Sequence, residues 1–352
     1  MRVLLITPNV DVEHAILGFL HYWADELAKH VDSLDILTFR AGKFSFNNKN
    51  IQVFDLSSPS RIMKFLKLNY YLFKLVPKND VVYIQMYPFL ALISYPYVKI
   101  FGKKMVMWYT HRCVTSTLLL VNKLVDKVMT AANNTYRINT HKKEILGHGI
   151  VFSGYPNLKR IVKKRGKKFI ILSVGRISPI KKFEVLLDAI NILVNKKNYK
   201  NIECLILGPV YDDKYYKKLL EIVEMRNLNS YVKFLGPVPH KKIKEIYMKA
   251  DLFVSTSQSG LDKAPLESMA LGIYTLICGS EYLEYFDKEL KEKCYYDVNN
   301  INELVEKIEY FIKNKDKEEK LRLKMMHHVL KHHSIESHAK KVKRVLEEVV
   351  EG

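Results

Sequence analysis

The residues from Ser255 to Gly272, written STSQSGLDKAPLESMALG, combine a turn, a helix start and a carboxylate. We expect Gly260 to form the turn and Pro265 to stand in the first turn of a helix over 264–271. Free backbone amides at a helix start bind anions. Glu267 can accept hydrogen bonds from two vicinal hydroxyls such as those of a ribose, or it simply stabilises the helix start as an acid. The stretch is therefore a candidate site for a phosphorylated ligand.

A second turn of the same design follows the apolar residues 169–175. Gly175 allows a close approach of the backbone to a ligand, Arg176 presents a forked guanidinium to phosphate oxygens, and Lys181 adds a second positive charge. Together these residues suit a diphosphate. A strand-to-helix turn in a basic protein also carries Arg and Lys by chance, and the pattern alone does not separate the two interpretations.

The elements that hold these turns alternate along the chain. In the first half we expect strands at 3–7, 34–39, 51–56, 81–86, 104–110 and 125–131, and helices at 14–30, 60–75, 88–101 and 116–124. In the second half we expect strands at 169–175, 201–208, 231–236, 251–256 and 273–279, and helices at 182–195, 212–227, 240–249 and 264–271. This β-α-β alternation is typical of doubly wound parallel sheets.

The chain is long enough for two domains. The fold class is α/β, with two doubly wound, Rossmann-like domains facing a cleft that the carboxyl ends of both sheets line. The expected bounds are an N-terminal domain over 1–158, a basic linker over 159–168, a C-terminal domain over 169–333 and an amphipathic helix over 334–352 that packs back on the N-terminal domain.

An apolar run without charges, residues 81–98, is nearly as long as a membrane span. It contains Gln85, Pro88 and Pro96, together with several tyrosines. A buried strand that ends near Met86, followed by a helix entered through Pro88, explains these residues better than a span does.

The composition limits the classes of binding partner that we expect. Lys and Arg number 57 against 37 acids, a formal charge of +20, so we expect an anionic partner: a phosphate-bearing substrate, an anionic membrane surface or nucleic acid. The segment 61–78 mixes five basic residues with aromatic residues and leucines, which suits either a membrane surface or an ordinary surface helix. Nucleic acid is the weaker option, because no recognised motif accompanies the basic residues of 159–168.

The four cysteines form no CxxC pair, which argues against a zinc site and a disulfide framework. The first residues, MRVLLITPNV, lack the regions of a signal peptide. We therefore expect a cytoplasmic protein, with peripheral contact to the inner face of the cell membrane as an option.

Four segments of the second half occur in the order and spacing of a known family: 173–190, 205–209, 232–257 and 260–277. In them the chain resembles the GT-B glycosyltransferases, specifically the large retaining group, family four, which uses nucleotide sugars. The first half is similar only in outline, through its opening strand and residues 108–112, 125–137 and 148–150.

The resemblance implies that Arg176 and Lys181 hold the donor diphosphate and act in catalysis, and that Glu267 holds the ribose. The family has two glutamates that flank seven residues, and Ser259 stands where the first would be. That acid contacts the transferred sugar, and Asp262 is near enough in sequence to supply a carboxylate instead. The complete set of donor contacts that we take from the resemblance is Gly175, Gly208, Val238, Ser259, Gly260, Asp262, Lys263, Ala264 and Glu267.

The resemblance also implies that His111, after the strand at 104–110, contacts the transferred sugar, although a lone histidine there is more often an ordinary loop residue. The glycine-rich turn that the family has after its first strand is represented only by Gly18. No Asp-x-Asp occurs in the sequence, so we expect transfer without a metal. For a retaining reaction we expect front-face attack by the acceptor, because the matched motifs contain no convincing nucleophile.

The expected function is transfer of a sugar from a nucleotide-sugar donor, UDP or GDP type, to a glycan or lipid-linked acceptor, as in the synthesis of cell envelope glycans. Two alternatives stay open. A nucleotide-sugar-binding protein without activity is suggested by Ser259, and a GT-B sugar epimerase would convert the donor without an acceptor.

Overall fold

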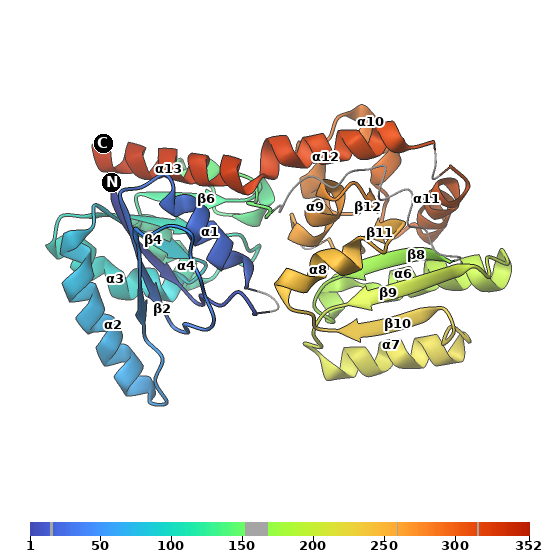
Figure 1. Cartoon of the computed structure of the whole chain (residues 1–352), viewed down its shortest axis with the longest axis horizontal. Helices are drawn as coiled ribbons and strands as arrows, with labels where there is room; N and C mark the ends of the chain where they lie inside the picture. Colours follow the sequence, from blue (N-terminus) through green and yellow to red (C-terminus); the bar gives the residue numbers. More distant parts are fainter. Residues whose placement is uncertain (15–16, 152–167, 259, 315–316) are drawn as a thin grey trace. The chain divides into compact units, whose positions relative to one another are not determined.

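The computed structural model describes residues 1–14, 17–151, 168–258, 260–314 and 317–352 (Figure 1). Contacts between Cα atoms divide the chain into two compact units. The N-terminal unit consists of Met1–Val151 with Pro239–Lys241 and His333–Gly352, and the C-terminal unit consists of Phe152–Val238 with Lys242–His332. Each unit is built around one parallel β-sheet covered by helices, the α/β fold class that the sequence predicts.

The sheet of the N-terminal unit has the strand order β3-β2-β1-β4-β5-β6-β7, and all its pairs are parallel. All six predicted strands are present, whereas β7 was not expected because its three residues, KEI, contain no apolar run. The strands are β1 Arg2–Thr7, β2 Ser33–Thr38, β3 Ile51–Asp55, β4 Val81–Gln85, β5 Lys104–Trp108, β6 Lys127–Thr130 and β7 Lys143–Ile145.

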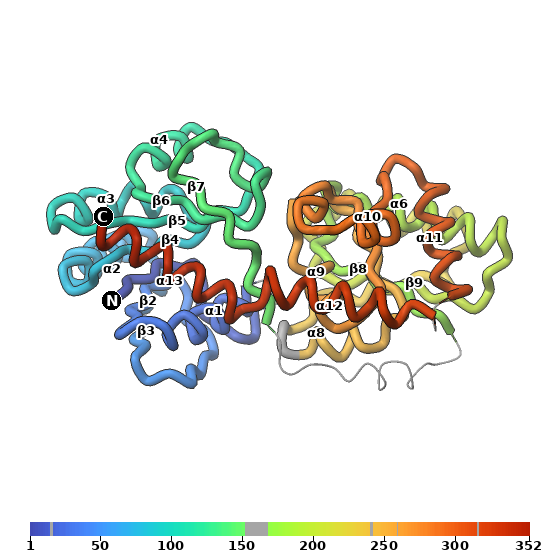
Figure 2. The backbone as a smooth tube through the Cα atoms, turned by 90° about the horizontal axis from the view of Figure 1, so that it is seen from above, coloured from blue at the N-terminus to red at the C-terminus, as the bar shows by residue number. Residues whose placement is uncertain are grey.

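The helices of this unit contribute to its core in two groups. Helices α2, α3 and α4 share one apolar cluster with the sheet. The last helix, α13, packs against α1 and along β5 and β6 (Figure 2). The helices are α1 Phe19–Ala28, α2 Arg61–Leu75, α3 Pro88–Ile100, α4 Ser116–Leu124 and α13 Ile335–Glu351.

The helix predicted to begin at residue 14 begins instead at Phe19. Before this start, side chains accept backbone amides. Asp11 Oδ1 accepts the amides of Glu13 at 3.0 Å and Lys43 at 3.3 Å, and His14 Nδ1 accepts an amide at 3.0 Å. Such bonds are common in turns and before helix starts, and the apolar period alone does not show where the turn ends and the helix begins.

The apolar run 81–98 divides as predicted into a strand and a helix. Strand β4 ends at Gln85, Met86 adopts a left-handed backbone with φ 64°, and Pro88 is the first residue of α3. The left-handed residue turns the chain, and proline is well tolerated where the helix amide has no partner. None of the described helices is both long enough and apolar enough to cross a bilayer.

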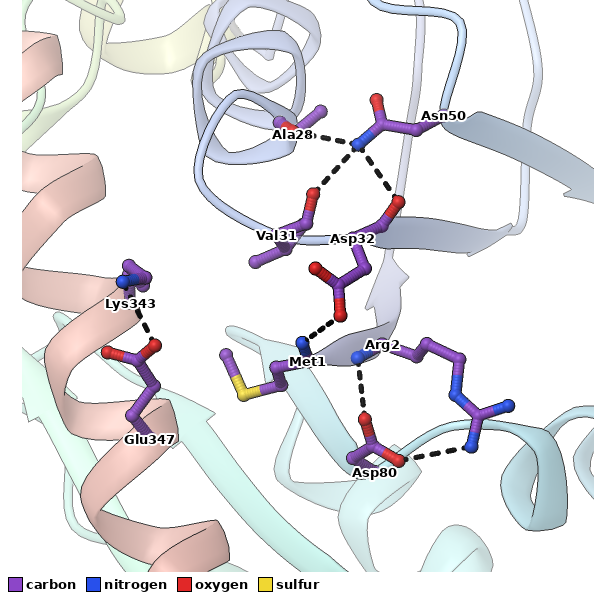
Figure 3. Close-up of polar contacts among 9 residues, drawn as sticks. All are labelled: Met1, Arg2, Ala28, Val31, Asp32, Asn50, Asp80, Lys343 and Glu347. Atoms are coloured by element: carbon purple, nitrogen blue, oxygen red, sulfur yellow. Dashed lines mark hydrogen bonds and ion pairs between the residues drawn. The ribbon is translucent and has the colours of Figure 1, made fainter.

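Polar groups at the amino edge of the N-terminal sheet bind one another (Figure 3). The Met1 ammonium pairs with the Asp32 carboxylate. Arg2 donates to Asp80 from its amide at 2.7 Å and from its guanidinium at 3.3 Å. Asn50 donates to three carbonyls between the end of α1 and the start of β2, at 2.8, 2.9 and 3.4 Å. This edge is therefore tied together, which leaves the carboxyl edge for ligands.

The C-terminal unit has the strand order β10-β9-β8-β11-β12, again entirely parallel. All five predicted strands and four predicted helices are present, and helices α10–α12 were not assigned from the sequence. The strands are β8 Phe169–Val174, β9 Ile202–Leu207, β10 Val232–Gly236, β11 Leu252–Val254 and β12 Tyr274–Leu276. The helices are α6 Phe183–Asn191, α7 Asp213–Met225, α8 His240–Tyr247, α9 Lys263–Ala270, α10 Lys288–Cys294, α11 Ile301–Asn314 and α12 Glu319–His333.

Candidate functional site

The two turns singled out in the sequence lie at the point where the strand order of the C-terminal sheet reverses. Strand β8 is followed along the chain by its neighbour β9, whereas its other neighbour, β11, comes much later. The strands β8 and β11 pair in the registers Ile171 to Leu252 and Leu172 to Phe253, so the loops that follow both strands leave the same sheet edge. Open α/β sheets bind ligands at such a point.

Lys181 joins the two loops. Its Nζ lies 2.6 Å from Oδ2 of Asp262 and 3.4 Å from Oγ of Ser257. Its backbone carbonyl accepts a hydrogen bond from the Thr256 hydroxyl at 2.6 Å. The ion pair is partly buried, with the Lys181 side chain 11% and the Asp262 side chain 27% exposed. The structure thus brings together two of the residues that the sequence predicted to bind the donor.

Arg176 is exposed at the start of the loop after β8 and lies over the ring of Tyr211, with 4.9 Å between the guanidinium carbon and the ring centroid. The amide of Ile177 donates to the carbonyl of Pro209 at 2.8 Å, which ties this loop to the one after β9. Stacking uses the face of the guanidinium and phosphate binding uses its N–H edge, so the Tyr211 contact is compatible with an anionic ligand.

Glycines at the ends of neighbouring strands let these loops approach closely. Gly208 has φ 151°, and a Cβ atom there would overlap the carbonyl oxygen of Gly175. The amide of Gly208 donates to the carbonyl of Gly236, itself left-handed with φ 68°, at 3.0 Å. A larger residue at position 208 would force the loops after β8 and β9 apart, so the glycine is required by shape.

The start of α9 has the features of an anion site. Gly260 has φ 117°, a conformation that favours glycine, and Asp262 is the N-cap. The Asp262 side chain makes no capping hydrogen bond, because its carboxylate is directed at Lys181. The first amides of the helix therefore receive no cap from this side chain, which itself binds Lys181.

A buried tyrosine, Tyr247, binds and orients the Glu267 carboxylate. The Tyr247 hydroxyl lies 3.1 Å from Oε2 of Glu267 and 3.1 Å from the carbonyl of Ala264. Tyr247 is fully buried and stacks on Phe253 with 5.8 Å between ring centroids. Burial raises the pKa of Tyr247 well above its usual value, so the hydroxyl keeps its proton and donates it. A carboxylate accepts several hydrogen bonds, so this support is compatible with ligand hydroxyls on Glu267.

Lys263, the first residue of α9, has a perturbed ionisation. Loss of solvent among surrounding protein atoms lowers its pKa to about 7, although the carboxylates of Glu267 and Asp262 oppose the shift. Its charge therefore changes near neutral pH.

The other predicted residues are placed as follows. Val238 and Ala264 are partly buried and pack against an apolar cluster of the C-terminal unit. His111 lies in the N-terminal unit, exposed in the loop after β5, and its Nδ1 accepts the Cys113 amide at 3.1 Å. Ser259 lies outside the described residues. Within the described ranges, no group of three or more His, Cys, Asp or Glu residues could hold a metal ion.

Gly18 stands at the N-cap of α1 with an ordinary helical backbone, φ −57° and ψ −23°. This conformation is open to any residue, so the position does not require glycine.

Several supporting residues were missed by the sequence analysis. Thr256 belongs to the polar end of a predicted strand, and Tyr211 follows a Gly-Pro pair at another strand end, so both carried a positional signal. Tyr247 and Tyr282 carried no such signal. The Tyr282 hydroxyl donates to the Asp262 carbonyl at 2.8 Å. Each contacts a residue 17 to 20 positions away, which no local pattern shows.

Residues 155–325 match the family model described as glycosyl transferases group 1. This segment, just under half of the chain, is similar to the group 1 glycosyltransferases, and the chain has the GT-B fold. The matched segment contains the loops after β8, β9 and β11 as well as α9, and therefore the whole constellation from Gly175 to Glu267.

Three known proteins illustrate the similarity. HepE of Anabaena, solved with UDP and glucose, superposes with a TM-score of 0.78 at 14% identity and covers 99% of this chain and 100% of that one. Sucrose-phosphate synthase of Thermosynechococcus elongatus gives 0.75 at 15% identity, covering 99% and 98%. Mannosylfructose-phosphate synthase of Agrobacterium fabrum is 27% identical over 112 residues, which span 31% of this chain and only a quarter, 25%, of that relative.

Proposed function

We propose that this glycosyltransferase moves a sugar from a nucleotide-sugar donor to a glycan or lipid-linked acceptor with retention of configuration. The observation that carries the proposal is the meeting of Lys181, the α9 start and Glu267 at the carboxyl edge of the C-terminal sheet, inside the matched family segment. UDP is the first candidate nucleotide, since HepE was solved with UDP and with UDP-glucose, and GDP is the second.

In this proposal the positive groups act on the leaving diphosphate. Arg176, Lys181 and the first amides of α9 neutralise the charge that develops as the bond to the sugar breaks, which favours the transition state over the bound donor. Glu267 holds the ribose hydroxyls, residues 236–238 lie beside the base, and His111 contacts the transferred sugar. No step of this scheme uses a metal ion.

The ion pair between Lys181 and Asp262 gives the site two arrangements. Without donor, Asp262 neutralises Lys181 at 2.6 Å. A bound diphosphate offers Lys181 a stronger partner, and the exchange would release the Asp262 carboxylate toward the sugar hydroxyls. This would supply the acid that the family motif lacks at Ser259.

The retaining reaction is then a front-face displacement. The acceptor hydroxyl forms its bond to the anomeric carbon on the face from which the diphosphate leaves. A phosphate oxygen of the leaving group takes the proton of that hydroxyl as the old carbon–oxygen bond breaks. Trapping of a covalent sugar adduct of the enzyme by mass spectrometry would contradict this scheme.

The first test is a panel of UDP, GDP, ADP and their common sugars, measured by thermal shift and by release of nucleoside diphosphate. We expect one nucleotide to raise the melting temperature and its sugar to be hydrolysed slowly in water. Stabilisation without any sugar release, even with lipid-linked and glycan acceptors, would favour a nucleotide-sugar-binding protein without activity. Conversion of the donor into an isomer would favour the epimerase, and no stabilisation by any nucleotide would contradict donor binding.

The lowered pKa of Lys263 predicts a pH dependence of donor binding. Below about pH 7 the ammonium is protonated and attracts the diphosphate, and above that pH the attraction is lost. We expect the Kd of the stabilising nucleotide sugar to rise by about tenfold between pH 6 and pH 8.5, since one hydrogen bond to a charged group is worth about 1.5–3 kcal/mol. Lys263→Met should flatten this profile, and Lys263→Arg should keep binding tight at pH 8.5. Parallel profiles for all three proteins would rule out Lys263 as the origin.

A further inference from the structure

Helix α2 presents apolar side chains on two opposite sides. Leu68, Leu72 and Leu75 are buried in the core of the N-terminal unit, as expected for an ordinary surface helix. The other side is apolar as well, and it faces solvent. We call this second side the outer stripe, which consists of Ile62, Met63, Leu66, Tyr70 and Phe73, with exposed fractions of 74%, 47%, 54%, 59% and 66%.

The spacing shows that the outer stripe is one continuous surface. Ile62, Leu66 and Phe73 are four and seven residues apart, which places them above one another on an α-helix, and Met63 and Tyr70 lie beside them. Single exposed apolar residues are normal, but a surface helix usually turns a polar face to water. A contiguous apolar surface is typical of an interaction site.

The apolar surface continues onto the end of α3, the neighbouring helix in Figure 1. The ring of Phe73 lies 5.7 Å from that of Phe101, centroid to centroid, and the Tyr97 hydroxyl donates to Oδ1 of Asn69 at 2.7 Å. Ile100, the last residue of α3, is 74% exposed. The outer stripe is therefore held on a rigid pair of helices.

The surroundings of the outer stripe are almost free of acids. Residues 56–125, which include α2, α3 and α4, contain one acid, Asp80, and Arg2 already pairs with it. Lys74 lies beside Tyr70, with 5.8 Å between its Nζ and the ring, and Lys99 precedes Ile100. The basic residues of this range are Arg61, Lys64, Lys67, Lys74, Lys78, Lys99, Lys103, Lys104, Arg112 and Lys123.

We propose that the outer stripe and the end of α3 dock on the surface of an anionic lipid bilayer. Apolar side chains along one helix face enter the boundary between headgroups and acyl chains, while lysines beside them extend to the lipid phosphates. A protein partner would need acids and a matching apolar groove in register, whereas a bilayer needs only a helix face with flanking positive charge. The docking follows from the exposed residues of α2 and α3 alone. Only its consequence, delivery of a lipid-linked acceptor, rests on the proposed function.

The test is co-sedimentation of the full chain with vesicles of phosphatidylcholine alone and of equal parts phosphatidylcholine and phosphatidylglycerol. We expect binding to the anionic vesicles that is at least tenfold stronger than to the neutral ones and that falls at high salt. The variant Leu66→Ser/Phe73→Ser should lose at least tenfold of the binding. The variant Lys74→Gln/Lys99→Gln should lose most of the salt-sensitive part.

A matched control changes exposed apolar residues elsewhere. Leu220 and Met225 on α7 of the C-terminal unit are 41% and 74% exposed, so Leu220→Ser/Met225→Ser should bind vesicles like the unchanged protein. Equal binding by the Leu66→Ser/Phe73→Ser variant, or no binding to anionic vesicles at low salt, would overturn the proposal. So would a dimer in light scattering that needs the outer stripe and forms in place of vesicle binding.

Nucleotide binding separates this proposal from the proposed function. Thermal shift by nucleotides in vesicle-free solution should be the same for the protein and for every surface variant, which also shows that the variants fold. If nucleotides stabilise the protein but vesicles do not bind it, the docking proposal alone fails. If vesicles bind it but no nucleotide stabilises it, the proposed function fails and the docking stands.

Discussion

Lys181→Met is expected to lower donor turnover by about a hundredfold to a thousandfold, the effect of removing one preorganised group from a developing negative charge, about 2.7–4 kcal/mol. The Lys181 side chain is only 11% exposed, and its backbone carbonyl is fixed by the Thr256 hydroxyl at 2.6 Å, so its position is constrained even when the diphosphate replaces Asp262 as its partner. Because little reorganisation is needed when the diphosphate leaves, the loss should fall mainly on kcat. Release of nucleoside diphosphate under saturating donor is the measurement.

Two further variants make this prediction specific. Lys200→Met removes an ammonium of the same unit that bonds only a backbone carbonyl, that of Val194 at 3.0 Å, and should leave turnover within twofold. Asp262→Asn keeps the shape of the partner and removes its charge. It should tighten binding of the nucleotide diphosphate, because Lys181 no longer has a competing carboxylate, and slow transfer if Asp262 then serves the sugar. Turnover by Lys181→Met close to that of Lys200→Met would contradict the role of Lys181.

The stability of Lys181→Met should change little. Partly exposed ion pairs contribute about 0–1 kcal/mol, so the melting temperature without donor should shift by only a few degrees at most. A large drop would mean that the lost activity reflects unfolding rather than catalysis.

The fold was predictable because its signals are local. Strands buried on both faces of a parallel sheet appear as continuous apolar runs, and VLLIT at 3–7 and FIILSVG at 169–175 are such runs. The break between β4 and α3 was visible for the same reason, since Pro88 favours a helix that begins there, whereas Pro96 is accommodated inside α3.

The missed elements lack such signals. Strand β7 is the tripeptide KEI, and α12 carries a run of lysines and histidines in KMMHHVLKHH that weakens its apolar period. At the start of α1, Asp11 and His14 bind backbone amides of the turn that precedes the helix, which the apolar period does not show. Tertiary and side-chain contacts thus outweighed the local pattern at these places.

For the candidate site, the residue types were visible and their contacts were not. Gly175, Lys181 and Glu267 stand at strand ends and a helix start, which a sequence shows. The pairing of Lys181 with Asp262 depends on β8 lying next to β11, a contact across 81 residues. The stacking of Arg176 on Tyr211 and the hydrogen bond from Tyr247 to Glu267 also join residues that are far apart in the sequence. These supporting contacts therefore follow from the sheet order and not from a motif.

Glu267→Ala is expected to abolish the stabilisation by nucleotides. If Glu267 holds two ribose hydroxyls, its removal costs two hydrogen bonds to a charged acceptor, each worth about 1.5–3 kcal/mol, and so weakens binding by about a hundredfold or more. The Glu267 side chain is preorganised by the buried Tyr247, whose hydroxyl lies 3.1 Å from Oε2. The carboxylate therefore loses little conformational entropy when the ribose binds. Titration of the stabilising nucleotide by calorimetry is the measurement.

A comparison of ribose with deoxyribose isolates the contact itself. The unchanged protein should bind the ribonucleotide at least tenfold more tightly than its 2′-deoxy form, and Glu267→Ala should bind both forms equally weakly. Tyr247→Phe keeps the ring in the core and removes only the hydroxyl that orients Glu267, so it should lose a smaller part of the ribose preference. If Glu267 has only a structural role in α9, the variant loses stability and keeps its discrimination between the two sugars, because such a role is indifferent to the 2′-hydroxyl.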